Sequence, residues 1–268
     1  MCKKYIGVDL GAWYGNKTRI AILEENEDDR LNLLSIEREE MKEPMERNER
    51  LVESLLKEAD NNAIIGIDAP FAIPYYLYNP LETKDTSEEL YNPDKLTGEL
   101  ANQLIFDNSA RFLKKITNEK ALAPAGDKIG KMTARMVQIV GKYTEQLNII
   151  RTPNLDTDVQ TIATIEVYPR ATLYQLNNGK IPQYKNTKNK NDCFKNKEGK
   201  QAMIELIEPY LTNNIQELDE IIIIDDDYDA VICALTVYLI DKYGYEKPAQ
   251  KDINKFTNSF IYIPKIKN

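Results

Sequence analysis

Acidic side chains stand at the ends of short hydrophobic segments of this chain. Asp9 ends the segment IGVD, Asp68 ends IGID, and Glu166 lies within IEVYP. Asp226 and Asp229 lie three residues apart in DDDYDAVICAL, so a helix would present them on one face. A carboxylate at the end of a buried strand is costly unless it is paired or binds a cation. Because Mg²⁺ and Mn²⁺ prefer oxygen ligands, the pattern predicts a shared metal site.

Each of these acids also fits a structural role that does not involve metal binding or catalysis. The run from Asp225 to Asp227 fits N-capping of a helix, and Asp9 and Asp68 fit turn positions that accept hydrogen bonds from backbone amides. Glu166 alternates with apolar neighbours and fits a solvent-facing position on an edge strand. The shared placement after successive hydrophobic segments favours the common site.

The overall composition excludes several other kinds of catalytic site. The 268 residues include no histidine, which rules out a His-based triad, an imidazole base and a zinc site with His ligands. Three cysteines, Cys2, Cys193 and Cys233, cannot form a four-cysteine zinc site. With 35 Lys and Arg against 43 Asp and Glu, the net charge is −8. This charge disfavours a generic nucleic-acid binder but fits an enzyme whose acidic centre is neutralised by cations.

Hydrophobic patterning predicts the elements that must position the acids. Strands are predicted at 4–10, 18–24, 31–37, 63–70, 161–169 and 259–264, and helices at 43–59, 98–117, 130–146, 200–212 and 226–243. The second and third strands flank the polar turn ENEDDR and are predicted to form an antiparallel hairpin. We expect a single α/β domain over 1–268 with a helical and loop insertion at 71–160. The acids at the strand ends are expected to meet at one edge of the sheet.

The hydrophobic segments are too short for a signal peptide or a membrane span. Asp9 interrupts the N-terminal apolar stretch, and the longest aliphatic run is Ile221 to Ile224. We therefore expect a cytoplasmic protein without a membrane partner, and its oligomeric state is open.

Five motifs, taken in order, resemble one protein family. They are IGVDLG, IGIDAP, DKIG (127–130) followed by Arg135, EVYP, and DDDYDAVICAL. The chain resembles domain-of-unknown-function family 429 from about residue 4 to residue 264. Its members are described as predicted nucleases with a ribonuclease H-like fold. The resemblance therefore implies a ribonuclease H-like mixed sheet flanked by helices, with a helical insertion.

The resemblance also implies roles for particular side chains. The residues that match metal ligands are Asp9, Asp68, Glu166, Asp226 and Asp229. Lys128 and Arg135 become candidates for phosphate or structural contacts, and Arg111 becomes a candidate for contact with the substrate.

The leading hypothesis is a metal-dependent nuclease or phosphodiesterase. Two Mg²⁺ or Mn²⁺ ions roughly 4 Å apart would activate the attacking water and stabilise the leaving oxygen, so that no histidine is needed. DNA, RNA and a small phosphorylated molecule fit this chemistry equally.

Two other hypotheses remain open on the sequence alone. One is a non-catalytic binding or scaffold module that keeps the ribonuclease H-like fold. The other is an actin-like or sugar-kinase-like ATPase, because IGVDLGAWYGNKTRIAIL resembles the first phosphate loop of those enzymes. The chain has 11 glycines and no Gly-Gly pair, which disfavours the ATPase.

Overall fold

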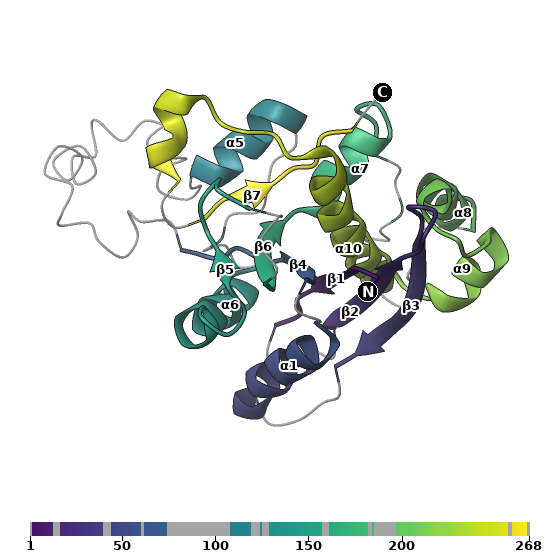
Figure 1. Cartoon of the computed structure of the whole chain (residues 1–268), viewed down its shortest axis with the longest axis horizontal. Helices are drawn as coiled ribbons and strands as arrows, with labels where there is room; N and C mark the ends of the chain where they lie inside the picture. The colour runs from purple at the N-terminus through teal and green to yellow at the C-terminus, as the bar shows by residue number, and fades with distance from the viewer. Residues whose placement is uncertain are drawn as a thin grey trace, which may run out of the picture.

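The computed structural model describes residues 2–12, 17–39, 44–59, 62–73, 108–118, 124, 129–156, 161–181, 184, 197–256 and 259–266. The strands are β1 (Lys4–Asp9), β2 (Arg19–Glu25), β3 (Leu31–Arg38), β4 (Ile64–Asp68), β5 (Ile149–Ile150), β6 (Ala163–Val167) and β7 (Ile261–Tyr262). The helices are α1 (Pro44–Glu58), α5 (Asn108–Thr117), α6 (Gly130–Tyr143), α7 (Pro169–Leu176), α8 (Lys197–Ile207), α9 (Ile215–Ile221) and α10 (Asp225–Tyr243). Two short 3₁₀ helices, η1 (Glu208–Tyr210) and η2 (Gln250–Lys255), complete these elements (Figure 1).

One mixed sheet organises the described part of the chain. Its strand order is β3-β2-β1-β4-β6-β5, and β7 pairs with β6. The pairs β1–β2 and β2–β3 are antiparallel, which confirms the predicted hairpin. The remaining pairs are parallel. The predicted α/β fold with a mixed sheet flanked by helices is therefore confirmed, and it is compatible with the ribonuclease H-like fold.

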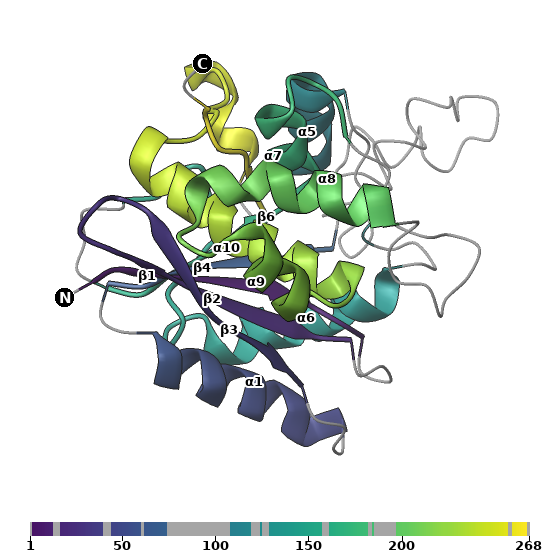
Figure 2. The same ribbon diagram turned by 90° about the vertical axis from the view of Figure 1, so that its right-hand side faces the viewer.

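Helices cover both faces of the sheet. Figure 2 shows α1 and α6 on one side of the strands and α8, α9 and α10 on the other. The side chains of β1 alternate accordingly: Tyr5 belongs to the core shared with α10, whereas Ile6 and Val8 belong to the core shared with α1 and α6. The face on which a strand residue lies therefore follows from its position along the strand.

α10 packs unusually close to the centre of the sheet. It is buried from Asp227 to Ile240, because it packs on the sheet and also contacts α7. A Cβ atom on Gly7 would lie 2.0 Å from the carbonyl oxygen of Ala230, and one on Gly66 would lie 2.9 Å from the carbonyl oxygen of Cys233. Glycine at these two positions lets the helix backbone contact β1 and β4 directly.

Several elements differ from the sequence predictions. α7 and α9 were not expected, because both are short and their apolar stripes cover only two turns. Within the predicted insertion at 71–160, the described part includes α5, α6 and β5, and β5 pairs with β6 in the main sheet. The division into a single domain with an insertion stays a prediction. Among the described residues, no helix has the length and apolar character needed to cross a bilayer.

Candidate active site

Two carboxylates lie side by side at the ends of β1 and β4. These strands are parallel, and Asp9 and Asp68 are in-register Cα partners. Gly7 and Gly66 stand two residues earlier on the same strands, and both face α10. Since side chains alternate along a strand, Asp9 and Asp68 lie on the α10 face as well. Both residues are half-buried, so a ligand can reach them from solvent.

α10 brings further carboxylates to the same place. Burial raises the pKa of the Cys233 thiol, and the negative charges of Asp68, Asp9 and Asp229 raise it further. All three carboxylates therefore lie within electrostatic range of one buried side chain. Asp229 stands one helical turn before Cys233 and is itself buried. Asp226 lies on the same side of the helix one turn earlier and is half-buried.

A buried tyrosine orients the carboxylate of Asp229. The Tyr184 hydroxyl donates a hydrogen bond to Asp229 Oδ1 at 2.5 Å. Burial and the negative charge of Asp229 raise the pKa of Tyr184, whereas the positive charge of Arg170 lowers it. A guanidinium group therefore acts on the same hydroxyl as Asp229. The sequence predictions missed both residues; the only local signal is that Arg170 directly follows EVYP, whose proline begins α7.

The acidic run at the start of α10 also contains a purely structural carboxylate. Asp227 is fully buried and accepts hydrogen bonds from the backbone N–H groups of Ile223 and Ile224, at 3.0 and 3.1 Å. Its two oxygens also pair with Arg19 Nε at 2.9 Å and Arg38 Nη2 at 3.4 Å. The N-cap residue is Ile224, and Asp227 is the third residue of α10; its carboxylate binds the backbone just before the helix, so its role is structural.

Glu166 lies on the other face of the sheet. It pairs in register with Ile67, which packs into the core shared with α1 and α6. Glu166 is only 4% exposed, and its strand is internal, so it does not face solvent on an edge. Glu166 Oε2 accepts hydrogen bonds from the Phe71 backbone N–H at 3.1 Å and from Ser259 Oγ at 2.6 Å. It therefore holds the loop that follows β4 against the segment before β7.

Arg135 is the centre of a buried hydrogen-bond network. Its Nε donates to Asn48 Oδ1, and its Nη1 donates to the Gly11 carbonyl and to Thr18 Oγ1, each at 2.9 Å. Its guanidinium also binds both oxygens of Glu39, at 2.6 and 3.2 Å. These contacts join α6, α1 and the turn after β1. Of the two roles expected for Arg135, the structure shows the structural contacts.

The structure gives no role in substrate contact to the other two basic candidates, Arg111 and Lys128. Arg111 is exposed on α5, a helix that packs against α7 and β7. Lys128 lies outside the described residues.

The pair Asp9 and Asp68 matches the way magnesium is usually held. Within the described ranges, no group of three or more His, Cys, Asp and Glu side chains is close enough to hold a metal ion. Magnesium, however, is commonly bound by one or two carboxylates, with waters and substrate phosphates as its other ligands. Two adjacent, half-buried carboxylates fit that requirement.

The Cys233 thiol is expected to resist alkylation in the folded protein. The thiolate is the reactive form of cysteine. The raised pKa keeps the Cys233 thiol protonated at neutral pH, and burial keeps the reagent away from it. Iodoacetamide labelling followed by mass spectrometry can be done in a Cys2→Ser/Cys193→Ser variant, in which Cys233 is the remaining cysteine. Labelling should appear only after unfolding in guanidinium chloride. Labelling of the native variant within minutes at pH 8 would contradict the placement of this residue.

One family matches most of the chain. The family described as "Protein of unknown function (DUF429)" matches residues 7–248, a range that includes all five candidate carboxylates. No curated protein and no solved structure matches the chain.

Proposed function

The chain belongs to the DUF429 family, and we propose that it is a metal-dependent nuclease or phosphodiesterase. The observation that carries this proposal is the in-register placement of the half-buried Asp9 and Asp68 at the ends of two parallel strands. Like charges that share a partly buried site raise the free energy of the folded state. A bound cation offsets this repulsion, and carboxylate oxygens are the donors that magnesium prefers.

Each described residue of the site has a role in this proposal. Asp9 and Asp68 would hold Mg²⁺ or Mn²⁺ at the ends of their strands, and Asp229 would add negative charge from α10 without being a direct ligand. When bound, the metal lowers the pKa of a water molecule and stabilises negative charge on the phosphate. Tyr184 fixes the orientation of Asp229, and Arg170 supplies positive charge for a phosphate group.

Two further acids, Asp226 and Glu166, have secondary roles next to the proposed metal site. Asp226 is half-buried one turn before Asp229, where it can meet a metal or its waters. Glu166 acts as a positioning residue, because it binds the backbone of Phe71 three residues after Asp68. Substrates of the proposed enzyme are DNA, RNA or a smaller phosphodiester.

Metal binding provides the first test of the function. Addition of Mg²⁺ or Mn²⁺ should raise the Tm, because a ligand that binds only the native state stabilises it by about 2.7 kcal/mol at a free concentration 100 times its Kd. The shift should disappear in Asp68→Asn and persist in Asp28→Asn, a matched change at an exposed turn near the other end of β1. Equal shifts in both variants would place the metal elsewhere.

Cleavage of defined substrates provides the second part of this test. Single-stranded DNA, duplex DNA, RNA and bis(p-nitrophenyl) phosphate are incubated with the full chain and Mn²⁺ or Mg²⁺. The proposal requires turnover of at least one substrate, with loss of turnover in EDTA. Metal binding without any cleavage would favour the non-catalytic module instead.

A further inference from the structure

Two elements that are far apart in the sequence bring exposed lysines together. α5 carries Lys114 and Lys115, η2 carries Lys251 and Lys255, and all four are exposed. Asn108 Nδ2 donates a hydrogen bond to the Lys255 carbonyl at 2.7 Å, so the start of α5 lies against the end of η2. Figure 1 shows the two elements side by side, with η2 in yellow. These four lysines are called the basic surface below.

Aromatic packing holds the two elements in place. The ring centroid of Phe112, on α5, lies 5.8 Å from that of Phe256, which directly follows η2, and 5.6 Å from that of Phe260. Phe256 and Phe260 pack edge to face at 5.2 Å. Because these rings fix α5 and η2 relative to each other, a partner binds the basic surface without first having to order it.

The basic surface concentrates positive charge in a chain whose net charge is −8. Of these two elements, which are described throughout, α5 contains no acid and η2 contains one, Asp252. The hydrogen bond from Lys255 lowers the pKa of Asp252, and the positive charges of Lys255, Lys251 and Lys115 lower it further. Cations of both elements therefore act at one point. Such a concentration of like charge is costly to the folded state, and a polyanion offsets that cost.

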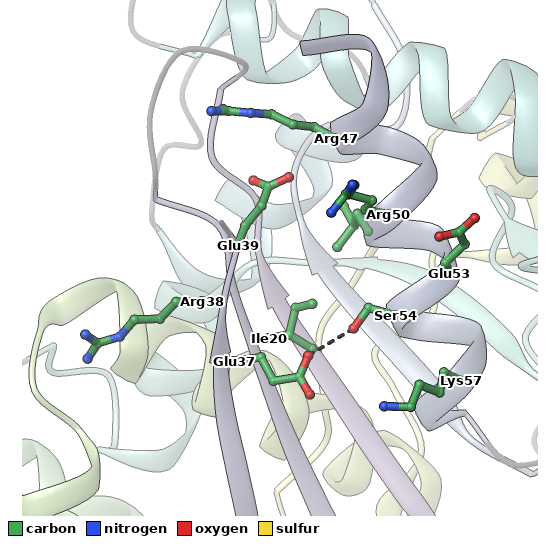
Figure 3. A pocket seen from close by; sticks show the side chains of 10 residues that line it. Ile20, Glu37, Arg38, Glu39, Arg47, Arg50, Glu53, Ser54 and Lys57 are labelled. Carbon is green, nitrogen blue, oxygen red and sulfur yellow. Dashed lines mark hydrogen bonds between the residues drawn. The ribbon is translucent and has the colours of Figure 1, made fainter. Parts of the chain in front are cut away.

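The pocket between α1 and β3 shows a contrasting arrangement of cations. It has a volume of about 360 Å³, and its lining includes four basic and three acidic side chains. Arg50 lies 3.6 Å from Glu46, and Lys57 lies 3.6 Å from Glu58. Figure 3 shows Arg50 and Lys57 among acids that come from both α1 and β3. The charge of this pocket is therefore nearly balanced, and its cations serve as a control for the basic surface.

The side chains beside the lysines favour a nucleic acid over a membrane as the partner. Asn118, Gln250 and Asn254 are exposed there, and side-chain amides commonly bind phosphate and sugar oxygens of nucleic acids. On α5 and η2, both fully described, no large apolar side chain is exposed. A membrane-binding surface would carry apolar or aromatic groups for insertion into the lipid.

We propose that the basic surface binds the sugar-phosphate backbone of a nucleic acid. The ten residues of α5 span about 15 Å, which is about four base steps of one DNA strand. Lys114, Lys115 and Lys251 contact phosphate oxygens, and these contacts are independent of base sequence. The inference narrows the substrate of the proposed function to a nucleic acid and rests on that function for cleavage, whereas binding requires no metal.

Binding can be measured by fluorescence anisotropy with labelled single-stranded DNA, duplex DNA and RNA in EDTA, so that no metal reaches the carboxylates. Lys115→Gln/Lys251→Gln should weaken binding about tenfold or more at about 50 mM salt, and should reduce the slope of log K against log[salt] by about 2. The matched control Arg50→Gln/Lys57→Gln, which removes the same charge from α1, should change neither quantity. Saturable binding of any of the three probes with this pattern supports the proposal, and the probe with the highest affinity identifies the nucleic acid.

Three results would overturn the assignment. They are the absence of saturable binding to all three probes, equal weakening in the two double variants, and an unchanged salt slope in Lys115→Gln/Lys251→Gln. Binding to vesicles of anionic phospholipid but to none of the nucleic acids would also overturn it, by making a membrane the partner.

Failure of this proposal is distinguishable from failure of the proposed function. Cleavage of bis(p-nitrophenyl) phosphate that depends on Asp68, without nucleic-acid binding in EDTA, would overturn the basic surface alone. Binding that is lost in Lys115→Gln/Lys251→Gln, without cleavage of any substrate, would support the basic surface and contradict the nuclease.

Discussion

Replacing Asp68 by Asn is expected to reduce metal-dependent phosphodiester cleavage by about 10³-fold or more, with Asp9→Asn giving a similar loss. Asparagine keeps the size of the side chain but removes the charge that we propose binds the metal. A loss of about 10³-fold corresponds to about 4 kcal/mol of transition-state stabilisation, which is within the several kcal/mol that a catalytic metal supplies. The measurement is kcat/KM with the substrate that the wild-type chain cleaves.

The same two variants should fold as stably as the wild-type chain when metal is absent. Asp9 and Asp68 are in-register neighbours, and removal of one charge relieves repulsion between them. Denaturant unfolding in EDTA measures this directly, with Asp28→Asn as the matched control. Full activity in both Asn variants would exclude the proposed site. Reduced stability together with reduced activity would mean that the carboxylates have a structural role.

Replacing Arg135 by Met is expected to destabilise the fold by about 3–5 kcal/mol. Breaking a buried ion pair leaves its partner uncompensated, and the partner here is Glu39, whose side chain is 9% exposed. The Gly11 carbonyl and Asn48 Oδ1 would also lose hydrogen-bond donors inside the protein. Urea unfolding gives the change in the free energy of unfolding.

A double variant separates the two roles that the sequence allowed for Arg135. If the residue is structural, Arg135→Met/Glu39→Gln should regain part of the lost stability, because no buried charge is left alone. If Arg135 instead contacts phosphate, Arg135→Met should keep its stability and lose activity. That second pattern would contradict the buried network seen in the structure.

The strand-end aspartates could be predicted because their signal is local. Asp9 and Asp68 each end a short apolar run, and the parallel pairing of the two strands then places them side by side. The start of the last helix was also visible in DDDYDAVICAL. The alternation and periodicity that bury apolar side chains are properties of neighbouring residues, so they appear in the sequence itself.

The sequence could not show which acids make structural contacts and which lie on the same face of the sheet as Asp9 and Asp68. Asp227 and Asp229 are two residues apart, so they point to different sides of α10. Asp227 binds the backbone before the helix and pairs with arginines, whereas Asp229 acts electrostatically on Cys233, as Asp9 does. Glu166 pairs in register with Ile67, one position before Asp68, and this single step places it on the other face of the sheet.

The sequence by itself determined that a catalytic site in this chain would have to work without histidine, and which hydrophobic segments carry the acidic residues at their ends. Only the tertiary structure decided that Tyr184 binds Asp229, that Arg170 acts on Tyr184, and that Arg135 is enclosed by residues up to 124 positions away. Strand and helix patterns reflect interactions over a few residues. Strand register and side-chain contacts between distant segments depend instead on how the whole sheet and α10 pack together.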